Sequence, residues 1–273
     1  MKDGHHLSGG AHLAIPLMID IHCHILPEMD DGPESLDETL EMCRIALDDG
    51  ITTVVATPHQ RDGIHHNSAK AIVKKVQTIA SHLKQANIPL ELLPGADVHI
   101  EVNTGEKILQ GEILSINNTK RYFLLEFPAH AIPPNIDRLV FNLLLKNIIP
   151  VLTHPERILE VQENPGRIYE LVSIGVLSQI TAMSITGGFG PMARKCAYTL
   201  LKHNLVHIIA SDAHSVDHRP PILSDAVKAV SRSLGEERAM EMVTTMPLEI
   251  IRGEQISHFS PPIKIQRKRF WFF

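Results

Sequence analysis

Short apolar runs alternate along the chain with longer segments in which apolar residues recur every three or four positions. Runs of this length are typical of strands, whereas the spacing of three and four is typical of amphipathic helices. The pattern predicts strands at Met18–His22, Thr52–Thr57, Leu90–Gly95, Tyr122–Glu126, Ile148–Leu152, Leu177–Thr181 and Val206–Ser211.

Helices are predicted between these strands. One stripe of the segment Leu36–Asp49 carries Leu36, Leu40, Cys43 and Leu47, and one stripe of Ala69–Ala86 carries Ile72, Val76, Ile79 and Leu83. Further helices are expected at Asn135–Lys146, Pro165–Ile174, Pro191–His203, Ile222–Ser233 and Glu236–Thr244. Because strands and helices alternate, we expect an α/β fold with a largely parallel sheet, as a barrel or a wide doubly wound sheet.

Length and composition favour one folded domain. The chain has 273 residues and is 44% hydrophobic, which is enough for one sizeable core. We expect residues 1–17 to be a flexible extension, residues 18–259 the folded domain and residues 260–273 a flexible tail that ends in basic and aromatic residues. This tail could contact an anionic membrane surface or a partner, or it could be a solvated segment without a specific role.

Charge and cysteine content exclude other classes. A net charge of -5 gives no support for a nucleic-acid-binding surface, and no Gly-rich nucleotide-binding loop follows a predicted strand. Cys23, Cys43 and Cys196 form no CxxC pair, and no apolar run is long enough to span a membrane. We therefore expect a soluble cytoplasmic protein. Of the 17 histidines, several are expected at the surface, namely His5, His6, His12, His65, His66 and His258.

Side chains that can bind metal ions follow the predicted strands. In parallel α/β folds the carboxyl ends of the strands meet at one mouth, where sites are built. His22 and His24 share one face of an extended segment, whereas Cys23 points the other way, into the packing. The full set at the strand ends comprises His22, His24, Asp31, His59, Asp97, Glu126, His154, Asp212 and His214.

The number and kind of side chains in this set indicate more than one metal ion. Glu126 interrupts an apolar strand, where a buried carboxylate is costly without a cation. The sequence D-D-G-P at residues 30–33 is either an ordinary capped turn or a turn that returns a carboxylate to the histidine pair. Five imidazoles and four carboxylates exceed the needs of one tetrahedral zinc, and a set without thiolate is compatible with Mn²⁺, Fe²⁺ or Zn²⁺.

The order of these motifs resembles the polymerase-and-histidinol-phosphatase (PHP) superfamily. They read D-I-H-C-H, T-P-H, G-A-D-V, L-E-F, T-H-P-E-R and S-D-A-H, and the similarity covers nearly the whole chain after Met18. The resemblance implies a distorted seven-stranded (β/α) barrel with a trinuclear metal centre. Three stretches further resemble the bacterial manganese-dependent protein-tyrosine phosphatases of capsule and exopolysaccharide systems, namely Met18–Pro33, His154–Arg157 and Ser211–Pro221.

This resemblance implies that the nine residues at the strand ends bind two or three Mn²⁺ ions and that Arg157 and Arg219 bind phosphate. Asp212 would also take part in catalysis. Asp97 departs from the common pattern, because a glutamate that bridges metals often stands there. Without the resemblance, Arg157 could simply pair with Glu156, and Arg219 could be a surface residue. The implied substrate is a phosphotyrosine protein, a bacterial tyrosine kinase that regulates capsule or exopolysaccharide synthesis.

A metal-activated water would attack the phosphoester in such an enzyme. Phenolate leaves without a strong general acid, and although His99 or His218 could serve, the sequence singles out neither. A thiol mechanism of the classical kind needs an arginine six positions after the cysteine. Those positions hold Met29, Asp49 and Lys202.

Three alternatives compete with the tyrosine phosphatase hypothesis. The first is a small-molecule phosphatase, such as one for histidinol phosphate, and the D-D-G-P and H-R-P-P elements argue against it. The second is a catalytically silent regulator, which predicts lost ligands. The third is an amidohydrolase, which usually supplies a lysine at a strand end, and no such lysine is seen.

Overall fold

The computed structural model describes residues 17–256 and 259–266 of the chain. Its strands pair in parallel throughout this part, in the orders β1-β2-β4 and β3-β5-β6-β7-β8-β9. The strands are β1 (Met18–Cys23), β2 (Ile51–Ala56), β3 (His59–Gln60), β4 (Glu91–Pro94), β5 (Asp97–His99), β6 (Tyr122–Glu126), β7 (Ile149–Thr153), β8 (Leu177–Thr181) and β9 (Ile208–Ala210).

The two sheets follow one another around a distorted α/β barrel, as expected. Thr57 and Pro58 interrupt the passage from β2 to β3, and Gly95 and Ala96 interrupt the passage from β4 to β5. The other junction is a parallel bridge between Cys23 and Ala213, so β1 meets the chain that leaves β9. The described chain therefore has nine strands where seven are expected, because the short strands β3 and β5 follow the predicted strands at Thr52–Thr57 and Leu90–Gly95 and were not predicted.

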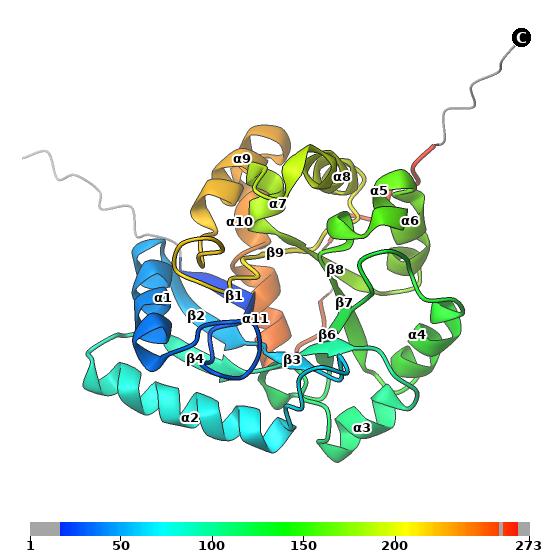
Figure 1. Ribbon diagram of the computed structural model, residues 1–273. Coiled ribbons are helices and arrows are strands. Elements are labelled where there is room, and N and C mark those ends of the chain that lie inside the picture. Colours follow the sequence, from blue (N-terminus) through cyan, green and yellow to red (C-terminus); the bar gives the residue numbers. More distant parts are fainter. Residues whose placement is uncertain (1–16, 257–258, 267–273) are drawn as a thin grey trace, which may run out of the picture.

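Helices surround the strands (Figure 1). They are α1 (Leu36–Asp48), α2 (Ala69–Gln85), α3 (Thr104–Gln110), α4 (Ile136–Leu144), α5 (Leu159–Glu163), α6 (Gly166–Ser173), α7 (Ala182–Thr186), α8 (Gly190–Lys202), α9 (Ser224–Leu234), α10 (Glu236–Glu241) and α11 (Thr245–Arg252), with 3₁₀ turns η1 (Ile116–Asn118) and η2 (Pro155–Arg157). All seven predicted helices are confirmed. Four were missed, α3, α5, α7 and α11, and three of these are shorter than two helical turns, so their apolar period is too brief to read.

The two longest predicted helices differ in how well their buried face was identified. In α2 the predicted stripe from Ile72 to Leu83 is buried. The buried face of α1 is instead formed by Thr39, Met42, Cys43 and Ala46. Its three leucines are only partly buried at the edge of this face. Serine caps begin both helices, because Ser35 accepts a hydrogen bond from the Glu38 amide and Ser68 from the Ala71 amide.

An apolar cluster fills the end of the barrel at which the strands begin. Ile19, Tyr122 and Leu177 lie near the start of their strands and pack with Met246 and Ile250 of α11. This helix closes that end and leaves the carboxyl ends of the strands free to carry polar groups. Within the described ranges, no helix has the length and apolar character needed to cross a membrane.

The described part of the C-terminal segment lies against the barrel. The Ile263 amide donates to the carbonyl of His203 at 2.8 Å, and Asn204 Nδ2 donates to the carbonyl of Pro261 at 3.1 Å. The basic and aromatic residues 267–273 lie outside the described residues, as do His5, His6, His12 and His258. The three-part division of the chain stays a prediction.

Candidate metal centre

All nine predicted ligands come together at the mouth formed by the carboxyl ends of the strands. His22, His59, Asp97 and Glu126 lie on β1, β3, β5 and β6, and the others lie on the loops that follow β1, β7 and β9. Their donor atoms form overlapping groups, each within 4.8 Å: His22, His24 and Asp212; His24, Asp31, His59 and His214; Asp97, Glu126 and His154; and His59, His99 and Glu126.

The histidine pair of β1 is oriented as expected from strand geometry. The Nε2 atoms of His22 and His24 lie 3.3 Å apart, and Asp212 Oδ1 lies 3.3 Å and 3.7 Å from them. Gln179 Oε1 lies 2.9 Å from the other ring nitrogen of His22. Asp30 Oδ2 lies 2.7 Å from the other ring nitrogen of His24. Such outer partners fix the orientation of a ligating imidazole and leave Nε2 free for an ion.

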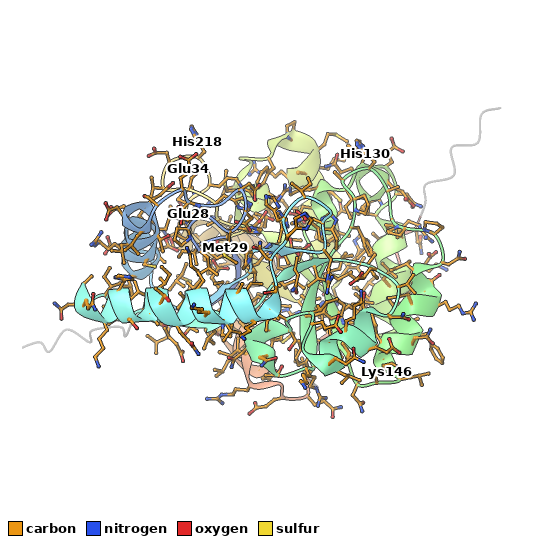
Figure 2. All side chains as sticks on the ribbon, turned by 60° about the horizontal axis from the view of Figure 1, so that its bottom comes forward. Glu28, Met29, Glu34, His130, Lys146 and His218 are labelled. Atoms are coloured by element: carbon orange, nitrogen blue, oxygen red, sulfur yellow. The ribbon has the colours of Figure 1, made fainter. Side chains whose placement is uncertain are left out.

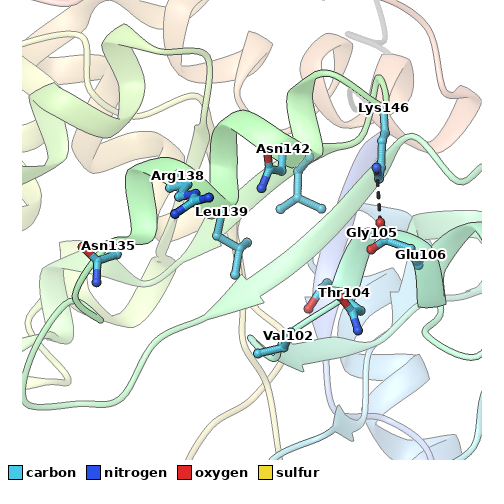
Figure 3. Close-up of a pocket in the computed structure, with 11 residues that line it drawn as sticks. Val102, Thr104, Gly105, Glu106, Asn135, Arg138, Leu139, Asn142 and Lys146 are labelled. Atoms are coloured by element: carbon cyan, nitrogen blue, oxygen red, sulfur yellow. Dashed lines mark ion pairs between the residues drawn. The ribbon is translucent and has the colours of Figure 1, made fainter.

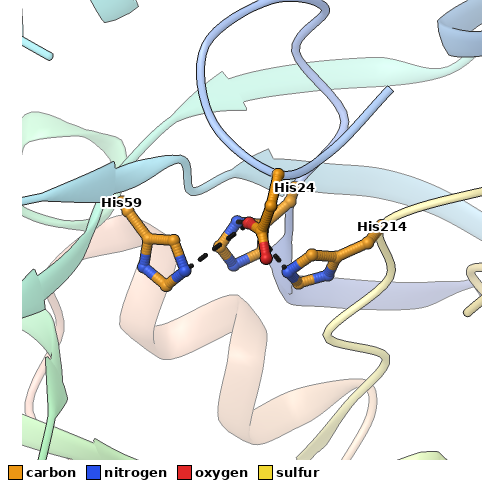
Figure 4. Close-up of side chains that lie close together, drawn as sticks. His24, His59 and His214 are labelled. Carbon is orange, nitrogen blue, oxygen red and sulfur yellow. Dashed lines mark ion pairs between the residues drawn. The ribbon is translucent and has the colours of Figure 1, made fainter. Parts of the chain in front are cut away.

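His24, His59 and His214 lie close together (Figure 4) and form a second group with Asp31. Asp31 Oδ1 lies 3.3 Å from Nε2 of His214, 3.6 Å from Nε2 of His59 and 3.9 Å from Nδ1 of His24. Side-chain exposure of Asp31 is 57%, so this group faces the opening of the mouth. The D-D-G-P turn thus does return a carboxylate to the histidines.

The third group contains buried polar atoms that need a partner. Both carboxylate oxygens of Asp97 are buried without a hydrogen-bond partner, and so is Nδ1 of His59. Glu126 Oε1, in the same group as Asp97, lies 3.4 Å from Nε2 of His154. A buried carboxylate that accepts no hydrogen bond is costly, and a divalent cation would remove that cost. The donor set therefore fits metal ions.

The electrostatics of this mouth also fit cations. Burial would raise the pKa of Asp212, but His22, His154, Arg219 and Arg157 together hold it well below its usual value. Burial would lower the pKa of His22, but Asp212 and Asp97 raise it to about 10. Carboxylates thus dominate the field at His22. A metal ion placed among them would displace that proton, since a ligating imidazole must be neutral.

The backbone is unusual at two of the strand ends. His154 has a φ of 33° and Asp212 a φ of 52°, both in the left-handed region that non-glycine residues rarely adopt. His154 directly follows β7, and Asp212 comes two residues after the end of β9. The sharp turn brings the two side chains back over the mouth, and such local strain is typical of functional sites.

Both predicted arginines reach the cluster through one carboxylate. Arg157 Nη1 donates to Asp212 Oδ2, and Arg219 Nη2 lies 2.6 Å from the same oxygen. Arg157 does not pair with Glu156, which is buried and accepts from the Thr181 amide at 3.0 Å. Arg219 is not a free surface residue either, since its side chain is only 22% exposed. The structure therefore brings both guanidinium groups to the cluster of predicted ligands.

Several histidines outside the nine predicted ligands were expected at the surface or were not assigned a role. His99 Nε2 lies 2.5 Å from Glu126 Oε2, and this hydrogen bond raises the pKa of His99. His65, expected at the surface, is half-buried and its ring lies 5.8 Å from that of His59. His218 is exposed and lies at the upper edge of Figure 2. Alternation along β5 places His99 on the side of Asp97, a signal that could have identified it.

A separate cavity of about 460 Å³ lies between α3 and α4 (Figure 3). It is lined by Asn135, Arg138 and Asn142 of the α4 region and by Lys146 and Glu106, which form an ion pair of 3.2 Å. The nine predicted ligands and both arginines are absent from its lining. This cavity is therefore separate from the cluster of predicted ligands.

Fold and site together define a class, the α/β barrels that gather imidazoles and carboxylates at the carboxyl ends of their strands. A structure of the phosphotriesterase homology protein from Escherichia coli, with phosphate in its active site, shares the fold with a TM-score of 0.56. The two chains are 10% identical, and the match covers 88% of this chain and 100% of the other.

The particular family follows from closer relatives. Residues 18–252 match the family described as "Capsular polysaccharide synthesis, CpsB/CapC", and the chain belongs to this family. It is 37% identical over 256 residues to tyrosine-protein phosphatase YwqE of Bacillus subtilis (strain 168), covering 94% of this chain and 100% of the relative. It is 31% identical over 244 residues to tyrosine-protein phosphatase CpsB of Streptococcus pneumoniae, covering 88% and 100%.

A solved structure agrees with these matches. It belongs to the crystal structures of YwqE from Bacillus subtilis and CpsB from Streptococcus pneumoniae, which are described as "unique metal-dependent tyrosine phosphatases". The TM-score is 0.87 at 38% identity, over 92% of this chain and 100% of that chain. The resemblance inferred from the motifs is thereby confirmed at the level of the family.

Proposed function

We propose that this protein is a metal-dependent protein-tyrosine phosphatase that acts on a phosphotyrosine protein of capsule or exopolysaccharide synthesis, a bacterial tyrosine kinase. One observation carries the proposal. Asp212 is shared between the His22–His24 pair on one side and the guanidinium groups of Arg157 and Arg219 on the other. A phosphate bound by the two arginines would therefore lie directly against the metal-binding groups.

The nine clustered residues would hold two or three ions, with Mn²⁺ as the proposed metal and Fe²⁺ or Zn²⁺ as alternatives. Once bound, these ions neutralise phosphate oxygens and lower the pKa of a water molecule, which supplies the nucleophile. Asp97 Oδ2 lies 3.5 Å from Nε2 of His22 and 3.8 Å from Nδ1 of His59. It therefore lies between the group that contains His22 and the group that contains His59. We propose that it joins them in the role that a longer glutamate often has.

The residues of the chain perform the remaining tasks. Arg157 and Arg219 bind the phosphate oxygens through their planar forks and hold the phosphorus in place. Asp212 accepts hydrogen bonds from both guanidinium groups and so orients them before the substrate binds. The tyrosine phenolate leaves without strong acid assistance because its conjugate acid has a pKa near 10. The three cysteines are buried and unpaired, which fits a reducing compartment such as the cytoplasm and leaves them unsuited as nucleophiles.

The test is phosphate release by purified, metal-stripped protein. A phosphotyrosyl peptide and histidinol phosphate are each assayed with and without added Mn²⁺, beside a His22→Ala/Asp212→Ala double variant. We expect Mn²⁺-dependent release from the peptide by the wild type and none by the variant. Release from histidinol phosphate alone would reject the tyrosine substrate, and release from neither substrate by metal-loaded protein would reject the phosphatase function.

A further inference from the structure

An aromatic side chain lies beneath both arginines of the mouth. The ring centroid of Phe189 is 4.4 Å from Cζ of Arg157 and 5.5 Å from Cζ of Arg219. The arginines come from different segments, one from η2 after β7 and the other from the loop after β9. A single ring therefore contacts the two cationic groups that also share Asp212.

The loop that carries Phe189 is built almost entirely of glycine. Gly187 and Gly190 have φ values of 102° and 87°, in the left-handed region that favours glycine. At Gly188 a Cβ would lie 2.6 Å from Cε of Met183. The amides of Gly187 and Gly188 both donate to the carbonyl of Met183, at 2.9 Å and 2.8 Å. The loop is thus a tight, hydrogen-bonded turn in which Phe189 is the residue with a side chain.

The same loop is connected to the arginine segment by a buried hydrogen bond. Helix α7, which leads into the glycine turn, begins just after Thr181, whose amide donates to Glu156 Oε1 at 3.0 Å. Glu156 directly precedes Arg157 in η2. The ring and the guanidinium group that it supports are therefore held by elements that are fixed to one another.

We propose that Phe189 is a positioning residue that holds Arg157 and Arg219 in place for phosphate through contact between its ring and their guanidinium groups. The ring supports a cation over its face, which leaves the in-plane N–H groups of a guanidinium free to donate to phosphate. An aliphatic side chain of similar volume cannot supply this attraction. The proposal rests on the proposed function, because it concerns how the same site recognises the phosphate.

The test compares Mn²⁺-loaded wild type with Phe189→Leu, Phe189→Tyr and Phe141→Leu. Phe141 is a 59% exposed phenylalanine on α4 and serves as the matched control. Two quantities are measured for each protein, KM for a phosphotyrosyl peptide and the dissociation constant of inorganic phosphate by calorimetry. We expect Phe189→Leu to raise both by roughly tenfold with a smaller change in kcat and with unchanged metal content, and Phe189→Tyr and Phe141→Leu to stay within about twofold of wild type.

A second background separates positioning from general packing. Phe189→Leu is repeated in an Arg157→Ala/Arg219→Ala protein, and phosphate affinity is measured again. If the ring acts through the arginines, the substitution changes affinity there by less than about twofold. An equal loss in both backgrounds, a loss of metal in Phe189→Leu, or a Tyr variant as weak as the Leu variant would overturn the proposal. If the wild type binds phosphate yet hydrolyses no phosphotyrosine, the proposed function fails while the affinities still decide the role of Phe189.

Discussion

The two ends of the barrel are built by the same strands but have opposite character. At the amino ends, Ile19, Tyr122 and Ile250 form part of an apolar cluster closed by α11. At the carboxyl ends, His22, Asp97 and Asp212 are just as deeply buried but are charged or polar. The apolar end supplies stability, and that stability allows the other end to keep costly polar groups close together until ions and phosphate arrive.

Strand β1 shows how one strand serves both ends. Ile19 and Ile21 belong to the apolar cluster with α11, whereas Cys23 packs in the outer core. The pairing of β1 with β2 shifts in register between Asp20 and Cys23. Such an irregularity changes the alternation of side chains and re-aims them, so His22 can face the mouth directly after Ile21. The comparison between the two ends leads to four predictions, given from the largest expected effect to the smallest.

Damage to the apolar end should cost stability without cost to catalysis. Ile250 is completely buried, and Ile250→Ala is expected to lower the free energy of unfolding by about 3 kcal/mol, because it leaves a cavity under the barrel. Urea denaturation measures this change. kcat/KM at a temperature where the variant is folded should stay at the wild-type value. Leu145→Ala, at a position that is 69% exposed, is the control and should change stability by less than about 0.5 kcal/mol.

Damage to the polar end should have the reverse effect. Arg157→Lys keeps the charge but loses the planar fork, so kcat/KM for a phosphotyrosyl peptide is expected to fall by about 10²-fold. Thermal melting should change little. The control is Arg167→Lys, since Arg167 pairs with Glu160 and Glu170 outside the mouth. A variant that melts much earlier and retains its kcat/KM would show that Arg157 belongs to the stabilising part of the protein.

A buried histidine at the amino end gives a pH test of the same contrast. His207 directly precedes β9, and burial and then Arg238 lower its pKa from 6.5 to about 3. The unfolded chain protonates this residue below pH 6.5 while the folded protein does not, so stability is lost as the pH falls. Between pH 7 and pH 5 the contribution of His207 to the free energy of unfolding should fall by about 2 kcal/mol.

The measurement is urea denaturation at pH 7, 6 and 5 for wild type and His207→Gln. All other groups are common to both proteins, so the difference between the two curves isolates this residue. The difference should grow in favour of the variant as the pH falls. A difference that does not depend on pH would mean that His207 is protonated in the folded state.

The smallest effect concerns the outer partner of the histidine pair. Burial would raise the pKa of Asp30, but the hydrogen bond with His24 lowers it to about 2, so the carboxylate stays ionised and orients the ring. Asp30→Asn should weaken Mn²⁺ binding by roughly tenfold while activity returns at saturating metal. Competition with a metal chelator measures the affinity. Asp225→Asn, which removes an exposed ion pair with Lys228 on α9, should leave the affinity unchanged.

Much of the fold could be read from local patterns. The stripe from Ile72 to Leu83 in α2 and the strands from β6 to β8 follow their predicted segments closely, because period and burial agree there. The short helices α5 and α7 were missed, since five residues are too few for a period. In α1 the predicted leucine stripe and the buried face lie next to each other on the helix, offset by one residue. Packing buried the face that carries Met42 and Ala46.

The candidate site shows the same limit. The sequence placed all nine donors at strand ends but could not show that Asp30 supports His24, that His99 meets Glu126 or that Asp212 joins both arginines. These contacts join residues far apart along the chain or around a turn, and their geometry depends on side-chain orientation that no local pattern contains.

The sequence by itself determined the class of fold, the location of the chemistry and the residue types, because hydrophobic period and strand-end motifs are local properties. Tertiary structure alone decided which donor atoms lie within reach of one another, which partners fix each imidazole and which ring lies under the two guanidinium groups. Those relations arise when β1 meets the chain after β9 and when Phe189, in the glycine turn after α7, contacts Arg157 of η2. They depend on closure of the barrel, in which distances of a few ångströms are set by packing between elements distant in sequence.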